Sequence, residues 1–240
     1  MLNSVRKIVI EDCQNQEIVI DNSESFSNLE ISVGKGSNLA LRIINFGQSA
    51  DGKIIAKVEE NGELQAIMAD FSNGKSNVDV SIELVGMQAK GIWKLSALSS
   101  NQDDKKFNIH FRHLAPFTYG LMDNYGVARN SSRLVFSGAN DIVHGAKNSK
   151  TRQNAKIIVF DEGAIAKADP RLNIDENEVE ASHAAVVGKL NDEHLFYLMS
   201  RGLSLDEAKR LITLGYLLPI ASFFHDDIKE RISKLIEERV

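Results

Sequence analysis

The sequence predicts a mainly β fold over residues 1–190, followed by a small α-helical domain over residues 191–240. Three observations support this division. Short β-branched runs separated by turn residues fill the first part. A strand–turn–strand pattern returns there about every 25 residues. After residues 180–190, apolar side chains recur at three- and four-residue spacing, which is typical of amphipathic helices.

The first predicted strands are short and rich in Ile, Val and Leu. Residues 8–10 and 18–20 are β-branched runs. Strand pairs joined by a turn then follow three times, at 29–33 with 39–43, 54–58 with 64–67, and 80–85 with 91–95. Their anchors lie 25 and 27 residues apart, at Val33, Val58 and Val85.

Such repeats without intervening helices are typical of stacked coils, in which each coil buries its apolar row against the next. A two-sheet sandwich is the alternative, because Asp51-Gly52 and Asn61-Gly62 are hairpin signals. Periodicity alone does not decide between the two architectures.

Further strand-like runs lie at 107–111, 133–136, 157–160 and 171–174. The polar segment 147–154 predicts an exposed face of a coil. Pro170 predicts that a segment ends there, because proline restricts both itself and the residue before it. Residues 175–178 predict an acidic turn.

The last 50 residues predict three helices. Asn191 is the expected cap of the first, and Gly202 its end. Ser204 and Glu207 form a capping box that begins the second, which Gly215 is expected to end. The last helix is expected to begin at a cap on Asp226 or Asp227. The predicted apolar faces are Leu205, Ala208, Leu211 and Ile212 in the second helix, and Ile228, Ile232, Leu235 and Ile236 in the last. These faces would cover the open end of the β-stack, dock a partner protein, or do both.

Composition excludes several classes of protein. A hydrophobic fraction of 43% indicates a globular chain, and a net charge of −5 argues against an unspecific nucleic-acid or membrane surface. The sequence contains neither a transmembrane run nor a signal-type apolar core, so we expect a cytoplasmic protein. The single cysteine, Cys13, excludes an internal disulfide and a multi-cysteine metal cage. We expect Cys13 to be a small half-buried residue of an early strand.

The histidines do not form an evident site. His110 and His113 lie three residues apart on a predicted strand, so they point to opposite faces and should not share a metal. His183 lies among small residues and is expected to project into a tight space at the domain joint, where a structural role is favoured on sequence alone. No phosphate-binding loop or nucleophile elbow is present, so we expect no self-contained active site and no enzyme. The remaining histidines are expected to be exposed: His144, His194 and His225.

Several motifs in the second half of the chain are more specific. They are Phe136-Ser137-Gly138, Thr151-Arg152-Gln153, the run at 169–174, the run at 179–188 and, most specific, the run at 195–202, followed by Glu207-Ala208 and the Gly215 region. In order and spacing these motifs resemble the SufB/SufD family of iron–sulfur cluster assembly proteins. The resemblance extends from about Arg129 to the C-terminus.

The resemblance implies a right-handed parallel β-helix with a C-terminal helical domain, which favours the stack over the sandwich. It also implies a scaffold that binds a SufC-type ABC ATPase, with ATP hydrolysis in that partner. Two SufB/SufD-type subunits would pair through the end of the β-helix. A transient iron–sulfur cluster would form at that interface, without an intrinsic cofactor. The expected SufC-docking residues are Leu195, Phe196, Tyr197, Arg201, Gly202, Glu207 and Leu211.

Residues near His183 resemble the SufD branch. Ala184 stands where SufB-type proteins carry an acidic residue, and Val187-Gly188 resembles SufD. Ala181 stands where many SufD proteins carry a cysteine, so no thiolate ligand is available from that position. In the family the matching histidine faces the partner's essential cysteine, and imidazole can bind iron. His183 is therefore implied as an interface ligand or proton-transfer group.

The resemblance thus predicts a SufD-like scaffold subunit that pairs with a SufB-type subunit and binds SufC. A self-pairing minimal subunit, which forms a homodimer, is an alternative within the family. A carbohydrate-binding or carbohydrate-active β-helix protein is the alternative from another class. It would require a groove of carboxylates or a calcium site.

Overall fold

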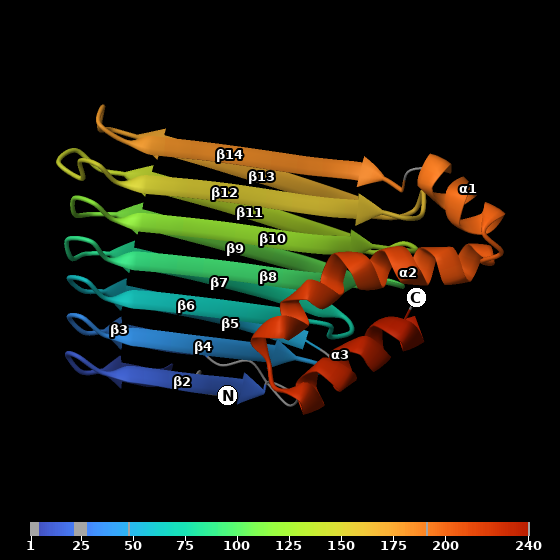
Figure 1. Ribbon diagram of the computed structural model, residues 1–240, viewed down its shortest axis with the longest axis horizontal. Helices are drawn as coiled ribbons and strands as arrows, with labels where there is room; N and C mark the ends of the chain where they lie inside the picture. The colour runs from blue at the N-terminus through green and yellow to red at the C-terminus, as the bar shows by residue number, and fades with distance from the viewer. Residues whose placement is uncertain (1–4, 22–27, 48, 191, 240) are drawn as a thin grey trace.

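The computed structural model describes residues 5–21, 28–47, 49–190 and 192–239. It is a parallel β-helix built from two seven-stranded sheets, with helices at the C-terminal end of the chain (Figure 1). Sheet A contains the odd-numbered strands: β1 (Val5–Ile10), β3 (Asn28–Val33), β5 (Ser49–Val58), β7 (Lys75–Leu84), β9 (Asp104–His113), β11 (Arg133–Ile142) and β13 (Ile165–Ile174). Sheet B contains the even-numbered strands: β2 (Asn15–Asp21), β4 (Asn38–Asn45), β6 (Glu63–Asp70), β8 (Lys90–Ser99), β10 (Tyr119–Ala128), β12 (Lys150–Val159) and β14 (Glu180–Lys189).

The strands pair in parallel register from coil to coil. Val33 lies opposite Val58, as the repeat predicts, whereas Val58 lies opposite Leu84 and not Val85. The hairpin alternative is wrong. Asp51-Gly52 lies inside β5, and Asn61 occupies a corner between β5 and β6 with a φ of 56°.

The core lies between the two sheets. Alternate side chains of each strand point inward, so Trp93, Phe107, Phe111 and Phe136 are almost completely buried. Each such side chain contributes about 1.5–3 kcal/mol when removed from water. The burial of apolar side chains between successive coils therefore stabilises the stack.

The prediction for Cys13 is wrong. Cys13 is exposed and lies in the corner between β1 and β2, with a φ of 58°. The strand ends at Ile10, because the chain must turn there to enter sheet B.

Four strands differ from the sequence prediction. The segment 147–154 was expected to be an exposed face, but its second half begins β12 and buries Thr151 and Gln153. Pro170 was expected to end a segment, but β13 continues through it. Among the described residues β13 is the last strand of sheet A, so the missing N–H of proline can face an edge where no strand pairs. Neither β10 nor β14 was predicted as a strand.

The helices are α1 (Asp192–Ser200), α2 (Leu205–Leu217), the 3₁₀ helix η1 (Leu218–Phe223) and α3 (Asp226–Arg239). The capping box is confirmed: Ser204 N donates to Glu207 Oε2 at 2.7 Å, and Ser204 Oγ accepts from Glu207 N at 3.3 Å. Gly202 follows α1 with a φ of 98°, as expected for a helix stop. The expected cap at Asn191 lies outside the described residues.

Two predicted helix boundaries are wrong. Helix α2 continues past Gly215 to Leu217, because the chain passes directly into η1. Helix α3 begins at Asp226, so Asp226 and Asp227 lie in its first turn and favour its positive end without being caps.

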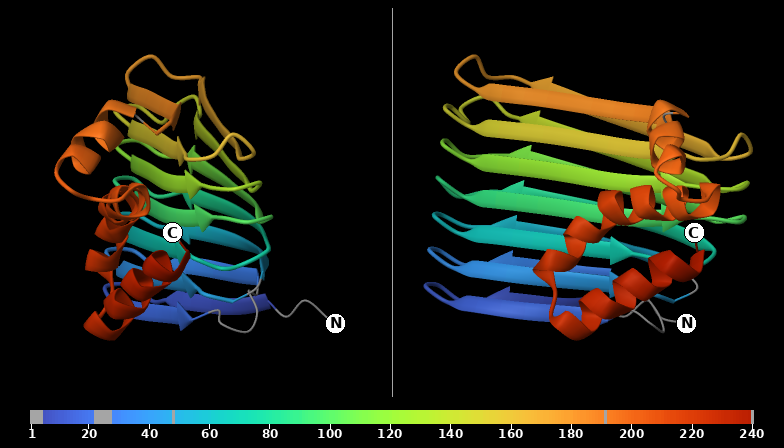
Figure 2. Two further views of the ribbon diagram at one scale, coloured as in Figure 1. Left: turned by 90° about the vertical axis from the view of Figure 1, so that its right-hand side faces the viewer. Right: turned by 45° about the vertical axis from the view of Figure 1, so that its right-hand side comes forward.

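The helices lie along the outer face of sheet B and do not cover the end of the stack (Figure 2). Outward residues of sheet B, such as Ile67 and Leu98, form a second apolar cluster with the helices. The predicted α3 face is confirmed by its buried residues: Ile228, Ile232 and Ile236. The predicted α2 face is confirmed at Ala208 and is wrong at Leu205 and Leu211. Leu205 and Leu211 are 44% and 50% exposed, while Ala208, Thr213 and Leu217 are buried.

Arg239 fastens the end of α3 to the β-helix. Its guanidinium donates to the carbonyl oxygens of Phe71 and Ser72 at 2.9 and 2.7 Å. It also donates to Ser100 Oγ and Asp103 Oδ2 at 2.7 and 2.6 Å. The helical region and the stack are therefore joined by a largely buried ionic contact as well as by the apolar cluster.

Candidate functional site

The last coil of the β-helix is open. In the part of the chain that the structure describes, β13 and β14 each pair on one side only. Each strand therefore presents unpaired backbone groups along its other edge. Side chains that would be buried in any lower coil are accessible here. For example, Ile174 is 38% and Val187 is 42% exposed.

His183 lies in this open layer. It pairs in register with Gln153, whose side chain points inward and is 1% exposed. In-register residues of neighbouring parallel strands face the same way, so the His183 imidazole points to the inner side of the coil. It is nevertheless exposed, because no described strand stacks above β14. The expectation of a tight space at the domain joint is therefore wrong.

The surroundings of His183 within β14 are small and apolar. Ala181, Ala185 and Val187 share its face by alternation and lie above Thr151, Ala155 and Ile157. Among the described residues, no group of three or more His, Cys, Asp or Glu side chains could hold a metal ion. One imidazole does not complete a metal site, so a metal bound here would need further ligands from outside the described residues.

A polar pair lies directly below this layer. Asn140 Nδ2 donates to Gln153 Oε1 at 2.9 Å, and both side chains are buried. Leu172 pairs with Asn140 in the coil above, as His183 pairs with Gln153. The sequence analysis did not assign a site role to Asn140 or Gln153. The polar character of Gln153 within a strand pattern is the signal that could have identified the pair.

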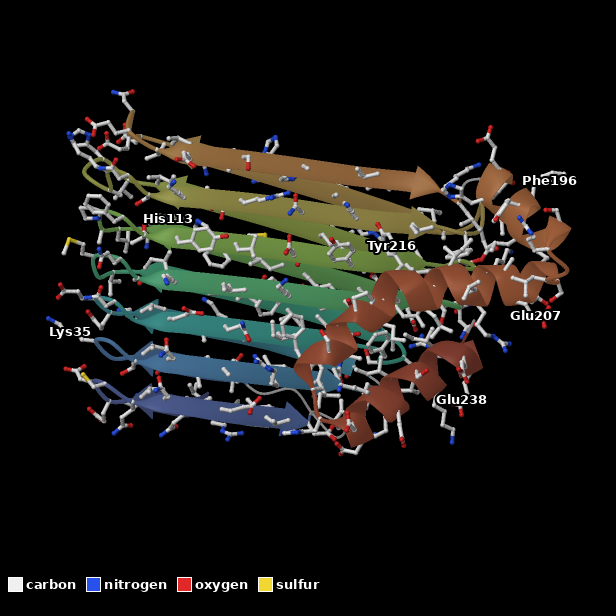
Figure 3. All side chains as sticks on the ribbon, in the orientation of Figure 1. Lys35, His113, Phe196, Glu207, Tyr216 and Glu238 are labelled. Atoms are coloured by element: carbon white, nitrogen blue, oxygen red, sulfur yellow. The ribbon has the colours of Figure 1, made fainter. Side chains whose placement is uncertain are left out.

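A second candidate surface lies on α1 and the start of α2. Phe196 and Tyr197 are 74% and 56% exposed, and Phe196 points away from the body of the molecule (Figure 3). Leu211 and Gly202 are also exposed, whereas Leu195 is half-buried. Large apolar side chains gathered on a surface in this way are typical of protein-interaction sites.

Two predicted docking residues have structural contacts. The carboxylate of Glu207 binds the backbone N–H and the hydroxyl of Ser204, and these bonds lower the pKa of Glu207. The Arg201 guanidinium lies 5.2 Å from the ring centre of Tyr197, a cation–π distance. Both residues therefore shape the surface on which the exposed aromatic side chains stand.

The structure separates His183 from the α1–α2 surface. The strand end at Lys189 lies six residues after His183, a distance of about 20 Å at 3.3 Å per residue. The two candidate surfaces can therefore be occupied by different partners at the same time.

The remaining histidines lie as predicted on opposite faces or in exposed positions. His110 is partly exposed and its Nε2 lies 2.7 Å from Asp141 Oδ2, whereas His113 is completely buried. His113 Nδ1 lies 2.8 Å from Thr118 Oγ1, and the ring packs where Gly120 has no side chain. His144, His194 and His225 are exposed.

His113 is expected to make the protein acid-sensitive. Burial lowers the pKa of His113 to about 4, although Asp141 acts to raise it. The unfolded chain binds a proton at this residue near pH 6.5. Stability is therefore fully present above about pH 6.5 and is lost as the pH falls towards about 4. At about pH 5 this loss should reach about 2 kcal/mol.

Urea titrations across this pH range test the prediction. His113→Gln should remove the acid-dependent loss, while His225→Gln, which changes an exposed histidine, should retain it. An unchanged pH slope in His113→Gln would contradict the assignment.

None of the helices in the described residues is long and apolar enough to cross a membrane.

Comparison with known proteins gives a consistent result. A family model described as "SUF system FeS cluster assembly, SufBD core domain" matches residues 5–216. The iron–sulfur cluster assembly protein SufD of Bacillus subtilis is 27% identical over 217 residues, which cover 89% of this chain and 48% of that protein.

Other relatives are SufBD family proteins of iron–sulfur cluster assembly. One from Mycobacterium tuberculosis is 27% identical over 182 residues, covering 76% of this chain and 22% of that protein. One from Staphylococcus epidermidis is 23% identical over 180 residues, covering 75% and 39%. The chain thus spans about half or less of the length of these relatives.

Proposed function

Because this chain belongs to the SufBD core domain family of the SUF iron–sulfur cluster assembly system and is SufD-like, we propose that it acts as a scaffold subunit of a cluster assembly complex. It is not itself an enzyme, and it acts in the cytoplasm. The observation that carries the proposal is the open last coil, where His183 lies among the apolar residues Ala181, Ala185 and Val187 on the inner face of β14.

The open coil pairs with a second subunit of the SufB type. Strand edges with unpaired backbone groups and exposed inner apolar side chains are costly in water, and a matching strand layer would satisfy both. A homodimer through the same surface is the alternative. The mass of the purified chain alone, compared with its mass when mixed with a SufB-type subunit, distinguishes the two.

A transient iron–sulfur cluster forms at this interface, with His183 as the contribution of this chain. Imidazole binds iron well, and ligands from the partner would complete the site. Because Ala181 and Ala184 flank His183, no thiolate or carboxylate side chain lies within two residues of it. His183 therefore acts either as a ligand or as a proton-transfer group.

The α1–α2 surface docks a SufC-type ABC ATPase, which hydrolyses ATP. The exposed aromatic residues Phe196 and Tyr197 are the anchors, since aromatic side chains supply much of the binding energy of protein interfaces. Residues 191–240 are in this proposal the docking domain, and residues 1–190 the β-helix core domain. The distance between this surface and His183 lets the ATPase bind while the second subunit occupies the open coil.

Light scattering of the chain mixed with a SufC-type ATPase tests the docking site. We expect a complex at micromolar concentration, and Phe196→Ser should weaken it by tenfold or more, or about 1.4 kcal/mol. Val9→Ser is the matched control, because Val9 is 58% exposed on β1, far from α1. A wild-type chain that forms no complex, or a Phe196→Ser chain that binds as tightly as wild type, would exclude this docking surface.

A further inference from the structure

The outer face of sheet A lies on the side of the stack opposite the helices (Figure 2). This face carries a groove of about 500 Å³. The groove crosses strands β5, β7, β9, β11 and β13. It is independent of both surfaces described above, because outward side chains of sheet A form its lining.

Small side chains create the hollow. Ser81, Ser137 and Ala139 form part of its floor on β7 and β11. Ala139 pairs with His110, and Ser137 pairs with Asn108, so longer side chains stand beside each small one. The sheet itself therefore presents a trough with polar walls.

Hydrogen bonds hold several of the wall residues in place. Asn108 Nδ2 donates to Asp79 Oδ1 at 2.6 Å, and Arg171 Nη2 donates to Asp169 Oδ2 at 2.7 Å. The contact between His110 Nε2 and Asp141 fixes the imidazole from outside the groove. A preformed polar site costs less ordering on binding than one made of free side chains.

Other groups in the groove have no partner among the residues that the structure describes. In the described ranges, the ammonium groups of Lys53 and Lys106 and the hydroxyls of Ser81 and Ser137 form no hydrogen bond or ion pair with the rest of the chain. The unused groups are therefore mainly hydrogen-bond donors, while the carboxylates of Asp79 and Asp169 already accept hydrogen bonds.

Positive charge is spaced along the trough. Lys53 lies on β5 at one end, Lys106 on β9, and Arg171 on β13 at the other end. Neighbouring strands are about 4.8 Å apart, so the backbones of β5 and β9 are separated by about 10 Å across the sheet. Two anionic groups of one small molecule can therefore meet different cations.

We infer that this groove binds a small polyanion that carries hydroxyl groups together with two or more phosphate or carboxylate groups. The free cations and hydroxyls match the acceptor-rich ends and the body of such a ligand. The volume suits one small molecule, and the lining contains no Phe, Tyr or Trp side chain.

Calorimetric titration of the complete chain with fructose bisphosphate, citrate and uncharged fructose tests this inference. We expect saturable binding of one or both anions, weakened by added salt, and no binding of fructose. Fructose bisphosphate alone would assign phosphate to the site, and citrate alone would assign carboxylate. Failure of both anions to bind up to about 10 mM would overturn the inference.

Variants locate the binding. Lys53→Gln and Lys106→Gln should each weaken it by about fivefold or more, and Ala139→Glu should abolish it by placing a carboxylate on the floor. Lys57→Gln is the matched control, because Lys57 is exposed on the same face of β5 outside the groove. All four exchanges lie at the surface, so the unfolding temperature should not change. If Lys57→Gln weakened binding as much as Lys53→Gln and Lys106→Gln do, the groove would not be the binding site.

Discussion

Replacing Lys105 with methionine is expected to lower the free energy of unfolding by about 3–5 kcal/mol, the largest effect of any single exchange considered for this chain. Lys105 and Asp70 are both completely buried, and Lys105 Nζ lies 2.5 Å from Asp70 Oδ1. Methionine keeps the length and most of the volume of lysine. The loss of stability therefore measures the effect of removing the charge and not the effect of creating a cavity.

The loss of stability arises because the Asp70 carboxylate stays buried without its cationic partner. In the native protein Asp70 also accepts from Asn45 Nδ2 at 2.8 Å and from the hydroxyls of Ser72 and Ser76 at 2.9 and 3.1 Å. Lys105 Nζ donates in addition to the carbonyl oxygen of Ser72 at 2.8 Å. Without the ammonium group, a buried negative charge remains with neutral donors only.

A double-variant cycle separates the charge effect from packing. Lys105→Met combined with Asp70→Asn removes both charges, so it should be more stable than Lys105→Met alone. Guanidinium titrations of the two single variants and the double variant give the coupling energy. A double variant as unstable as the sum of the single variants would show that the ion pair has no special energetic role.

The pH dependence of stability provides a second measure of the Lys105–Asp70 ion pair. Burial acts to raise the pKa of Asp70, but Lys105 and the hydrogen bonds outweigh it and hold the pKa below the ordinary 3.8. In the wild type this stability is present above about pH 4 and is lost at lower pH. In Lys105→Met only the hydrogen bonds from neutral groups still oppose the effect of burial, so the pKa of Asp70 should rise above its ordinary value. The variant should therefore lose stability as the pH rises, and its deficit relative to wild type should grow from about pH 4 to pH 7.

This ion pair illustrates what sequence reasoning cannot reach. The two residues lie on strands β6 and β9 of different sheets, 35 residues apart. Only the stacking register brings them together. Buried polar side chains also hid strand β10 and the first half of β12, because Asn124, Thr151 and Gln153 interrupt the apolar alternation by which strands are recognised.

Local chemistry was predictable where it depends on neighbours in sequence. The capping box at Ser204 and Glu207 and the stop at Gly202 need only a few adjacent residues, and both are confirmed. Parallel stacking was not predictable from periodicity, since strands of a stack and of a sandwich alternate in the same way. The family resemblance decided that question.

The exposure of His183 illustrates the same limit at the candidate site. Its position at the end of the β-rich part of the chain and its small neighbours are visible in sequence. Its accessibility follows from β14 being the last described strand of sheet B, which depends on how the whole stack is arranged. The same arrangement explains why Leu205 and Leu211 are exposed, because the α2 face that meets sheet B is set by the surface of the stack.

Replacing His183 with alanine is expected to abolish, or reduce about tenfold or more, cluster assembly by a complex of this chain with SufB-type and SufC-type partners. Loss of groups that only orient metal ligands already costs about 10–100-fold in affinity or activity, so loss of a ligand should cost at least as much. Stability should remain within about 0.5 kcal/mol of wild type, because the side chain is exposed and no described strand covers it.

Three measurements make this test decisive. Light scattering should show an unchanged complex, a thermal melt an unchanged fold, and visible absorbance the loss of the assembled cluster. Ser182→Ala is the matched control, since Ser182 is the adjacent residue and points to the opposite face of β14. Wild-type assembly by His183→Ala would assign His183 a structural role.

Substitution by cysteine distinguishes the two chemical roles of His183. A thiolate is a good ligand for iron in clusters, so His183→Cys should recover part of the bound iron if the imidazole is a ligand. If the imidazole only transfers protons, His183→Ala should bind iron normally, and only the rate of assembly and its pH profile should change. Because Ala181 and Ala184 leave the adjacent positions without thiolate or carboxylate groups, either result reports on this one imidazole.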